Sequence, residues 1–195
     1  MTEDLLSRSA SVDYEDYGSL RVETVEQRDN DLLVSLVVTA DEDPDLPQNV
    51  RITCQSWREN TLVPGHYADV MLTRDHVLLW HYHQPHVLVS FNGHVPDPLA
   101  VVGALFERHT ELVGNLIPFS KYFNPGMRLS ELIRGSFGML ADGPERLVLA
   151  YEEVMSHYGV SVSHHRSVSA YDEALSILMM DENYVIANGF VAEAI

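Results

Sequence analysis

The chain has 195 residues and a mass of 22.0 kDa, with 46% hydrophobic and 21% charged residues. This composition is typical of a folded globular protein and excludes a wholly disordered chain. Twenty-nine acidic and twelve basic residues give a formal net charge of −17, which repels phosphate backbones and anionic lipids, so neither a nucleic acid nor a membrane is an expected partner. The single cysteine, Cys54, excludes a disulfide within the chain and a four-cysteine zinc site.

Residues 1–17 are acidic and poor in apolar side chains, which predicts a flexible N-terminal arm ahead of a single domain over 18–195. The sequence contains no run of eighteen apolar residues, which is about the length that a membrane-spanning helix needs. The lone cysteine agrees with a reducing compartment, so we expect a cytoplasmic protein. Eleven arginines to one lysine fit either GC-rich codon usage or adaptation to high salt, and we expect a protein of bacterial type.

The segment 18–95 is predicted to be rich in strands, because apolar and polar residues alternate between turn signals. Its most apolar run, 32–39, is expected to be a strand buried on both faces. In the next strand, one face is expected to carry Val50, Ile52 and Cys54. Connections this short cannot hold crossover helices, so we expect about six strands, mostly antiparallel.

Two of these strands, 77–83 and 86–92, are expected to form a hairpin with Gln84 and Pro85 at its tip. Strand parity then places Trp80 on the core face, opposite Val89.

The segment 96–182 is predicted to be mainly helical. Asp97 and Pro98 suit a helix start, and the helix is expected to run to about Asn115. Its core stripe is expected to contain Leu99, Val102, Phe106, His109 and Val113. Further helices are expected at 129–134, from a capped start at 142–145 to Gly159, and at 169–180, with a short strand near 160–162.

The last residues, 184–194, are predicted to form a hairpin, because Asn188-Gly189 favours a type I′ turn. The expected fold class is therefore α+β: an N-terminal antiparallel sheet of about six strands, three or four α-helices and a short C-terminal β-hairpin. The β-rich part spans 18–95, the helical part 96–182 and the hairpin 184–194.

No phosphate-binding loop, dinucleotide fingerprint, nucleophile elbow or H-E-x-x-H motif occurs in the sequence. Cys54 lies in a half-buried strand pattern and is expected to be an inert thiol. His109 is expected to be a hydrogen-bonded core histidine. Whether the protein is an enzyme is left open by these observations.

The one cluster with possible chemistry is histidine, because seven of the ten histidines lie between residues 66 and 109. On the predicted hairpin, His81, His83 and His86 share one face at the same end. Three imidazoles gathered at one end of a sheet face suit a divalent metal such as zinc or iron. We therefore weigh a metal site against a polar sheet face without a ligand; no other cofactor is indicated.

The His-x-His pattern of His81 and His83, with Gly93 seven residues beyond His86, resembles the first motif of the cupin family over about thirteen residues. The resemblance implies a metal-binding strand pair. The sequence departs from the family in having no glutamate ligand, with His86 near that place, and in having no second motif downstream.

An aromatic loop at 118–126 brings Phe119, Tyr122 and Phe123 close together in the sequence. These side chains are expected either to line a pocket or interface or to pack over the sheet. The leading interpretation of the whole chain is a non-catalytic binding or protein-interaction module whose partner is another protein. The alternatives are a metal-dependent enzyme that uses the histidine cluster, and an acidic inhibitor that mimics nucleic acid.

Overall fold

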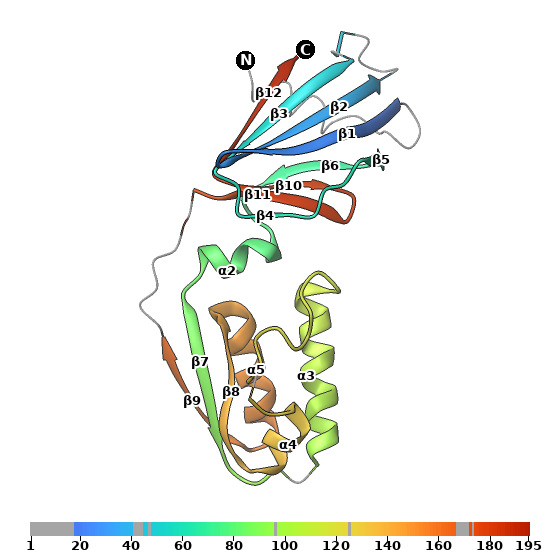
Figure 1. Cartoon of the computed structure of the whole chain (residues 1–195). Helices are drawn as coiled ribbons and strands as arrows, with labels where there is room; N and C mark the ends of the chain where they lie inside the picture. Colours follow the sequence, from blue (N-terminus) through green and yellow to red (C-terminus); the bar gives the residue numbers. More distant parts are fainter. Residues whose placement is uncertain are drawn as a thin grey trace. The chain divides into compact units, whose positions relative to one another are not determined.

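The computed structural model describes residues 18–40, 45–46, 48–95, 97–124, 126–166, 172 and 174–195. The predicted arm 1–17 lies outside the described residues. The chain divides into two compact units, one formed by residues up to Leu79 together with Ala174–Ile195, the other by Trp80–Glu173 (Figure 1). The prediction of a single domain concerns independent folding, which this division does not measure, and stays a prediction.

The predicted α+β class is confirmed, since antiparallel sheets and helices build the described chain. The first unit holds two sheets. The five-stranded sheet runs in the order β12 (Gly189–Ala194), β3 (Asn49–Gln55), β2 (Asp31–Ala40), β1 (Gly18–Arg28) and β5 (Gly65–Tyr67). The four-stranded sheet runs in the order β4 (Glu59–Asn60), β11 (Asn183–Ala187), β10 (Ser176–Met180) and β6 (Val70–Thr73).

The core of the first unit follows strand alternation. Val50, Ile52 and Cys54 of β3 are buried together, as predicted. In β2, however, Val34, Leu36 and Val38 are buried, whereas Leu33, Ser35 and Val37 on the other face are only half-buried. The prediction of a strand buried on both faces is therefore wrong, because the apolar residues on the second face of β2, Leu33 and Val37, stay partly exposed.

Two predictions near the C-terminus are wrong. The described end of the predicted helix 169–180 is strand β10, whose five residues are all buried. A short apolar run does not distinguish a buried strand from a buried helix. The hairpin 184–194 does not form, because β11 and β12 belong to different sheets. The amide of Asn188 donates instead to the carbonyl oxygen of Gln55, at 3.0 Å, and the hairpin partner of β11 is β10.

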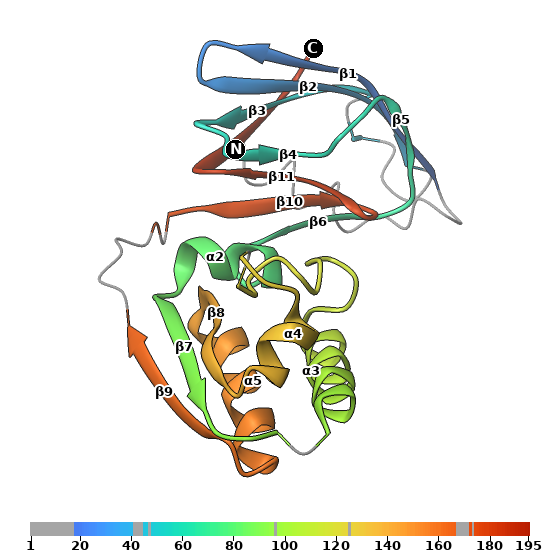
Figure 2. The same cartoon turned by 60° about the horizontal axis from the view of Figure 1, so that its bottom comes forward.

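The second unit is a three-stranded antiparallel sheet covered by helices on one face (Figure 2). Its strand order is β8 (Phe137–Pro144), β7 (His86–Asn92) and β9 (Ser161–Arg166). Helix α5 (Glu145–His157) packs on all three strands, and α3 (Pro98–Val113) packs on α5. Two short helices, α2 (Trp80–His83) and α4 (Leu129–Arg134), complete the unit.

The predicted strand 77–83 is wrong. Residues Val77–Leu79 form a 3₁₀ turn, η1, which leads into α2. Leu78, Leu79 and Trp80 are buried one after another, a pattern that a half-exposed strand cannot produce. The second strand of the predicted hairpin is present as β7, but it pairs with β8 and β9. Val87, Val89 and Phe91 are buried on its inner face, as predicted.

Helix α3 begins as predicted. The Asp97 carboxylate accepts from the amides of Leu99 and Ala100, both at 3.1 Å, and Pro98 occupies the first turn. The predicted core stripe is wrong in its first half, because Leu99 and Phe106 are exposed. The buried positions recur at every fourth residue: Val101, Leu105, His109 and Val113.

The other predicted helices of the second unit are present. Helix α4 has the expected bounds, and α5 ends shortly before Gly159, whose φ is +73°. Asp142 does not cap α5, since it is part of β8. The short strand predicted at 160–162 is the start of β9. None of the helices among the described residues has the length and apolar character that a membrane span requires.

Candidate functional site

The three predicted metal ligands do not share a strand face. His81 and His83 lie on α2, whereas His86 begins β7. Residues two apart face different sides of a helix, although they would share one face of a strand. The reason for expecting three neighbouring imidazoles is therefore lost, and with it the local resemblance to the cupin motif, which requires strands.

The structure does bring two of the histidines together. Nδ1 of His81 lies 3.1 Å from Nε2 of His86, within hydrogen-bond distance. The Tyr122 ring stacks at 6.1 Å from the His81 ring, and Oδ1 of Asp142 lies 3.9 Å from Nδ1 of His86. A hydrogen bond between imidazoles uses one ring as donor and the other as acceptor. The nitrogens that face each other are thus engaged with one another.

Across the described part of the chain, no three His, Cys, Asp or Glu side chains are grouped so as to hold a metal ion. Metal binding by His81, His83 and His86 stays a prediction.

The aromatic loop forms part of the interior of the second unit. Tyr122 and Phe123 are buried, and Phe119 is half-buried. Phe123 stacks on Tyr151 of α5 with ring centres 4.8 Å apart, and Phe119 contacts Phe123 edge-on at the same separation. Of the two expected roles, packing against the sheet describes these contacts: Phe123 also forms a bridge with Ala141 of β8.

His109 is a hydrogen-bonded core histidine, as predicted. Its Nε2 lies 2.7 Å from the carbonyl oxygen of Ile117, so this nitrogen carries the proton and donates it. Its Nδ1 lies 2.7 Å from the hydroxyl of Tyr151, which therefore donates. Burial raises the pKa of the Tyr151 hydroxyl far above its ordinary value, which keeps this donor protonated.

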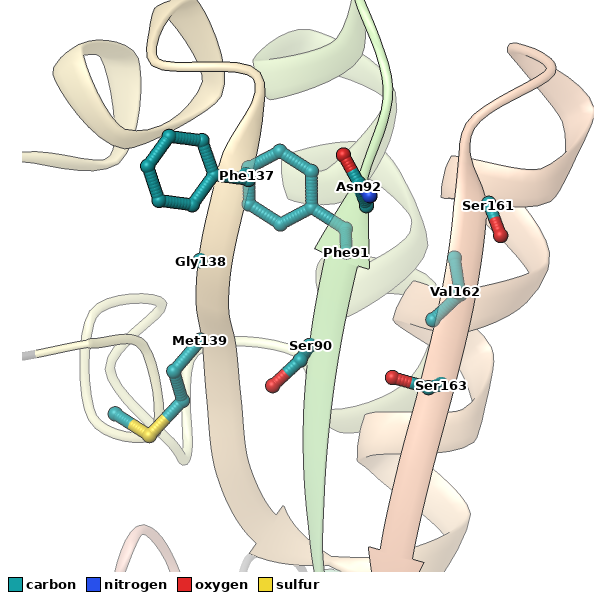
Figure 3. A pocket seen from close by; sticks show the side chains of 9 residues that line it. All are labelled: Ser90, Phe91, Asn92, Phe137, Gly138, Met139, Ser161, Val162 and Ser163. Atoms are coloured by element: carbon teal, nitrogen blue, oxygen red, sulfur yellow. The ribbon is translucent and has the colours of Figure 1, made fainter.

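The outer face of the three-stranded sheet, opposite α5, holds an open hollow of about 710 Å³ (Figure 3). Cross-strand rows build its floor: Met139, Ser90 and Ser163 form one row, and Phe137, Asn92 and Ser161 form the next. Phe137 is 71% exposed. The complete lining consists of Ser90, Phe91, Asn92, Phe137, Gly138, Met139, Ser161, Val162 and Ser163. The predicted aromatic residues do not line it.

The two edges of this sheet differ. Residues 122–124 cover the outer edge of β8: the Asn124 amide donates to the Leu140 carbonyl at 3.0 Å, and the Asp142 amide donates to the Tyr122 carbonyl at 2.9 Å. On the other side, no strand formed by described residues pairs with the outer edge of β9. Among the described residues, one side of the sheet is thus left without a paired strand, next to the hollow.

Strand β9 is held to α5 by two ion pairs on the inner side of the sheet. Nδ1 of His164 lies 3.0 Å from Oε2 of Glu152, and Arg166 pairs with Glu145. Five of the six residues of β9 are exposed. Nothing in the sequence marked this strand as a site apart from the serine and histidine content of 161–166.

Three comparisons with known proteins gave no match, whether with protein families, with curated proteins or with solved structures. Function must therefore be inferred from the geometry of the chain itself. The two features that geometry singles out are the hollow on the outer sheet face and the edge of β9, with which no described strand pairs.

Proposed function

We propose that this protein is a non-catalytic interaction module that binds an extended polypeptide segment along β9. The observation that carries the proposal is the contrast between the covered edge of β8 and the outer edge of β9, which no described part of the chain pairs with. An uncovered edge presents a row of backbone N–H and C=O groups, which is a template for a further strand.

Strand β9 lacks the features by which proteins keep an edge from pairing. It contains no proline and no lysine, and its ladder with β7 runs from Ser161 to Arg166 without a bulge. The only residue in β9 with a permanent charge, Arg166, lies at the end of the strand and pairs with Glu145. The backbone of β9 is therefore suited to accept another strand.

The side chains next to this edge fit a segment with small or polar residues. Side chains of an added strand alternate between the two faces of the sheet. One set would lie beside Ser161 and Ser163 at the rim of the hollow, and the other beside Val162 and His164. Backbone hydrogen bonds would supply affinity, and the hollow would select side chains on its face.

A cytoplasmic location is part of this proposal and rests on the lone, buried cysteine. The metal-dependent enzyme and the acidic nucleic-acid mimic stay alternative predictions. The proposal differs from both in requiring backbone pairing at β9.

A random library of displayed peptides tests the proposal without a known partner. Selection on the full chain should enrich peptides that slow amide hydrogen exchange in β9. The amides of β8 at residues 140–142 are an internal control, because the chain already covers that edge and their exchange should not change. Failure to enrich any peptide at a protein concentration at which the chain is monomeric, or binders that leave β9 exchange unchanged, would overturn the proposal.

A further inference from the structure

We propose that the natural occupant of the β9 edge is a second copy of this chain, paired antiparallel through β9 about a two-fold axis at Ser163. The inference rests on the proposed function and names its partner. Pairing would join two three-stranded sheets into one sheet of six strands. The outer strands of this sheet would be the two copies of β8, whose edges residues 122–124 already cover, so assembly would stop at a dimer.

Symmetry restricts how two copies of β9 can pair. Two identical antiparallel neighbours are related by a two-fold axis perpendicular to the sheet, which keeps the outer faces on the same side. Directly opposite residues in such a pair share a face. The axis must therefore pass between one residue and the same residue of the partner. The registers with the longest overlap have Ser163 or His164 at the axis.

Side-chain chemistry favours the register centred on Ser163. On the outer face, Ser163 lies opposite the partner's Ser163, and Ser161 lies opposite the partner's His165. On the inner face, Val162 lies opposite the partner's His164. Hydroxyls and imidazoles in these pairs can form hydrogen bonds, and no two basic side chains meet.

The register centred on His164 is less favourable. It places two imidazoles opposite each other at the axis and Val162 opposite the partner's Arg166. Both His164 and Arg166 already use the carboxylates of α5. Like charges directly opposite each other destabilise a strand pair, and two imidazoles at the axis are like charges whenever both are protonated.

The register centred on Ser163 also continues the floor of the hollow across the axis. Met139, Ser90 and Ser163 form one cross-strand row within a copy. In the dimer this row would run on into the partner's Ser163 and the partner's Ser90. The two hollows would become one trough with a serine floor, a surface that neither copy has alone.

Engineered cysteines test the register directly. The only native thiol, Cys54, is buried, whereas Ser163 and Ser161 are exposed. In the proposed dimer a Ser163→Cys pair has its Cβ atoms roughly 5 Å apart, close enough for a disulfide to form. A Ser161→Cys pair is offset by four residues, about 13 Å along the strands, which a disulfide cannot span. Mild oxidation should therefore crosslink Ser163→Cys into a dimer and leave Ser161→Cys monomeric.

Sedimentation equilibrium of the full chain supplies the second test. Ser163→Lys places two lysines opposite each other at the axis and should raise the dimer dissociation constant by about tenfold or more. Ser163→Thr keeps the hydroxyl and should leave it nearly unchanged. Because each copy carries a net charge of −17, added salt should strengthen the dimer by screening repulsion.

The outcomes separate this inference from the proposed function. A monomer at every concentration, with no Ser163→Cys crosslink, would overturn the dimer, and the proposed function would stand if selected peptides still protect β9. Crosslinking of Ser161→Cys in place of Ser163→Cys would overturn the register. A monomer whose β9 amides are protected without any peptide would overturn both proposals, because the chain would then cover its own edge.

Discussion

The ring of Tyr122 packs against the backbone of Gly143, so that a Cβ atom built on Gly143 would lie 2.7 Å from two of the ring carbons. Such a separation is far below van der Waals contact. Tyr122 also stacks on His81, and its carbonyl accepts from the amide of Asp142. Gly143 therefore lets the loop 122–124 lie flat on the edge of β8.

Replacing this glycine should be destabilising. We expect Gly143→Ala to lower the free energy of unfolding by about 1–3 kcal/mol, as overpacked core sites do. Gly103→Ala is the matched control: it lies in α3 with nothing within 4 Å of an added Cβ, so it should stabilise the helix by roughly 0.5–1 kcal/mol. Urea unfolding followed by Trp80 fluorescence in a Trp57→Phe background reports on the second unit. Equal effects of the two substitutions would contradict the packing described here.

Tyr151→Phe removes the hydroxyl that donates to Nδ1 of His109. His109 is only 2% exposed, so its ring nitrogen would be left without this partner in the interior. We expect a loss of about 1–3 kcal/mol in the free energy of unfolding. Tyr158→Phe, in a half-exposed residue at the end of α5, should change it by less than about 0.5 kcal/mol. A loss that small for Tyr151→Phe as well would show that the hydrogen bond contributes nothing to stability.

The thiol of Cys54 should not react in the folded protein. Burial, and secondarily the carboxylate of Asp31, raise the pKa of this thiol to about 12, so almost no reactive thiolate is present near pH 8. Because folding raises the pKa of this thiol, the thiol contributes in full to the free energy of unfolding below the ordinary thiol pKa. That contribution is lost as the pH rises toward 12.

Labelling with a thiol-specific disulfide reagent checks this prediction. The native chain should remain unlabelled for as long as it stays folded, and the unfolded chain in concentrated urea should react at once. The Ser163→Cys variant is the control, since its added thiol is exposed and should be labelled in the native state. Rapid native labelling of Cys54 would mean that the core of the first unit opens readily.

Zinc should not stabilise the protein. The nitrogens of His81 and His86 that face each other are within hydrogen-bond distance, and His83 lies two residues from His81 on a helix. Zinc sites in proteins ordinarily use three or four protein ligands. We expect the same melting temperature with and without zinc at about pH 7.5, where imidazole is neutral. A zinc-dependent rise that His83→Ala abolishes would instead establish the three-histidine site predicted from the sequence.

Local signals in the sequence determined much of the helical part of this protein. Asp97 and Pro98 define the start of α3 because a capping carboxylate and a fixed proline φ act within one turn. Gly159 marks the end of α5 for a similarly local reason, its positive φ. Alternation also placed Val87, Val89 and Phe91 on the inner face of β7.

Tertiary structure decided which strands pair and which residues meet. Asn188-Gly189 is a favourable hairpin turn, yet β12 pairs with β3 and β11 with β10, because the pairing partners of these strands come from distant parts of the chain or from the preceding strand. The predicted strand face of the histidines was wrong for a related reason: His81 and His83 would share one face on a strand, but Trp80–His83 form a helix whose first residue is buried together with Leu78 and Leu79. The position of β9 at the edge of the described sheet depends on where the rest of the chain packs, a property that no local pattern in 161–166 contains.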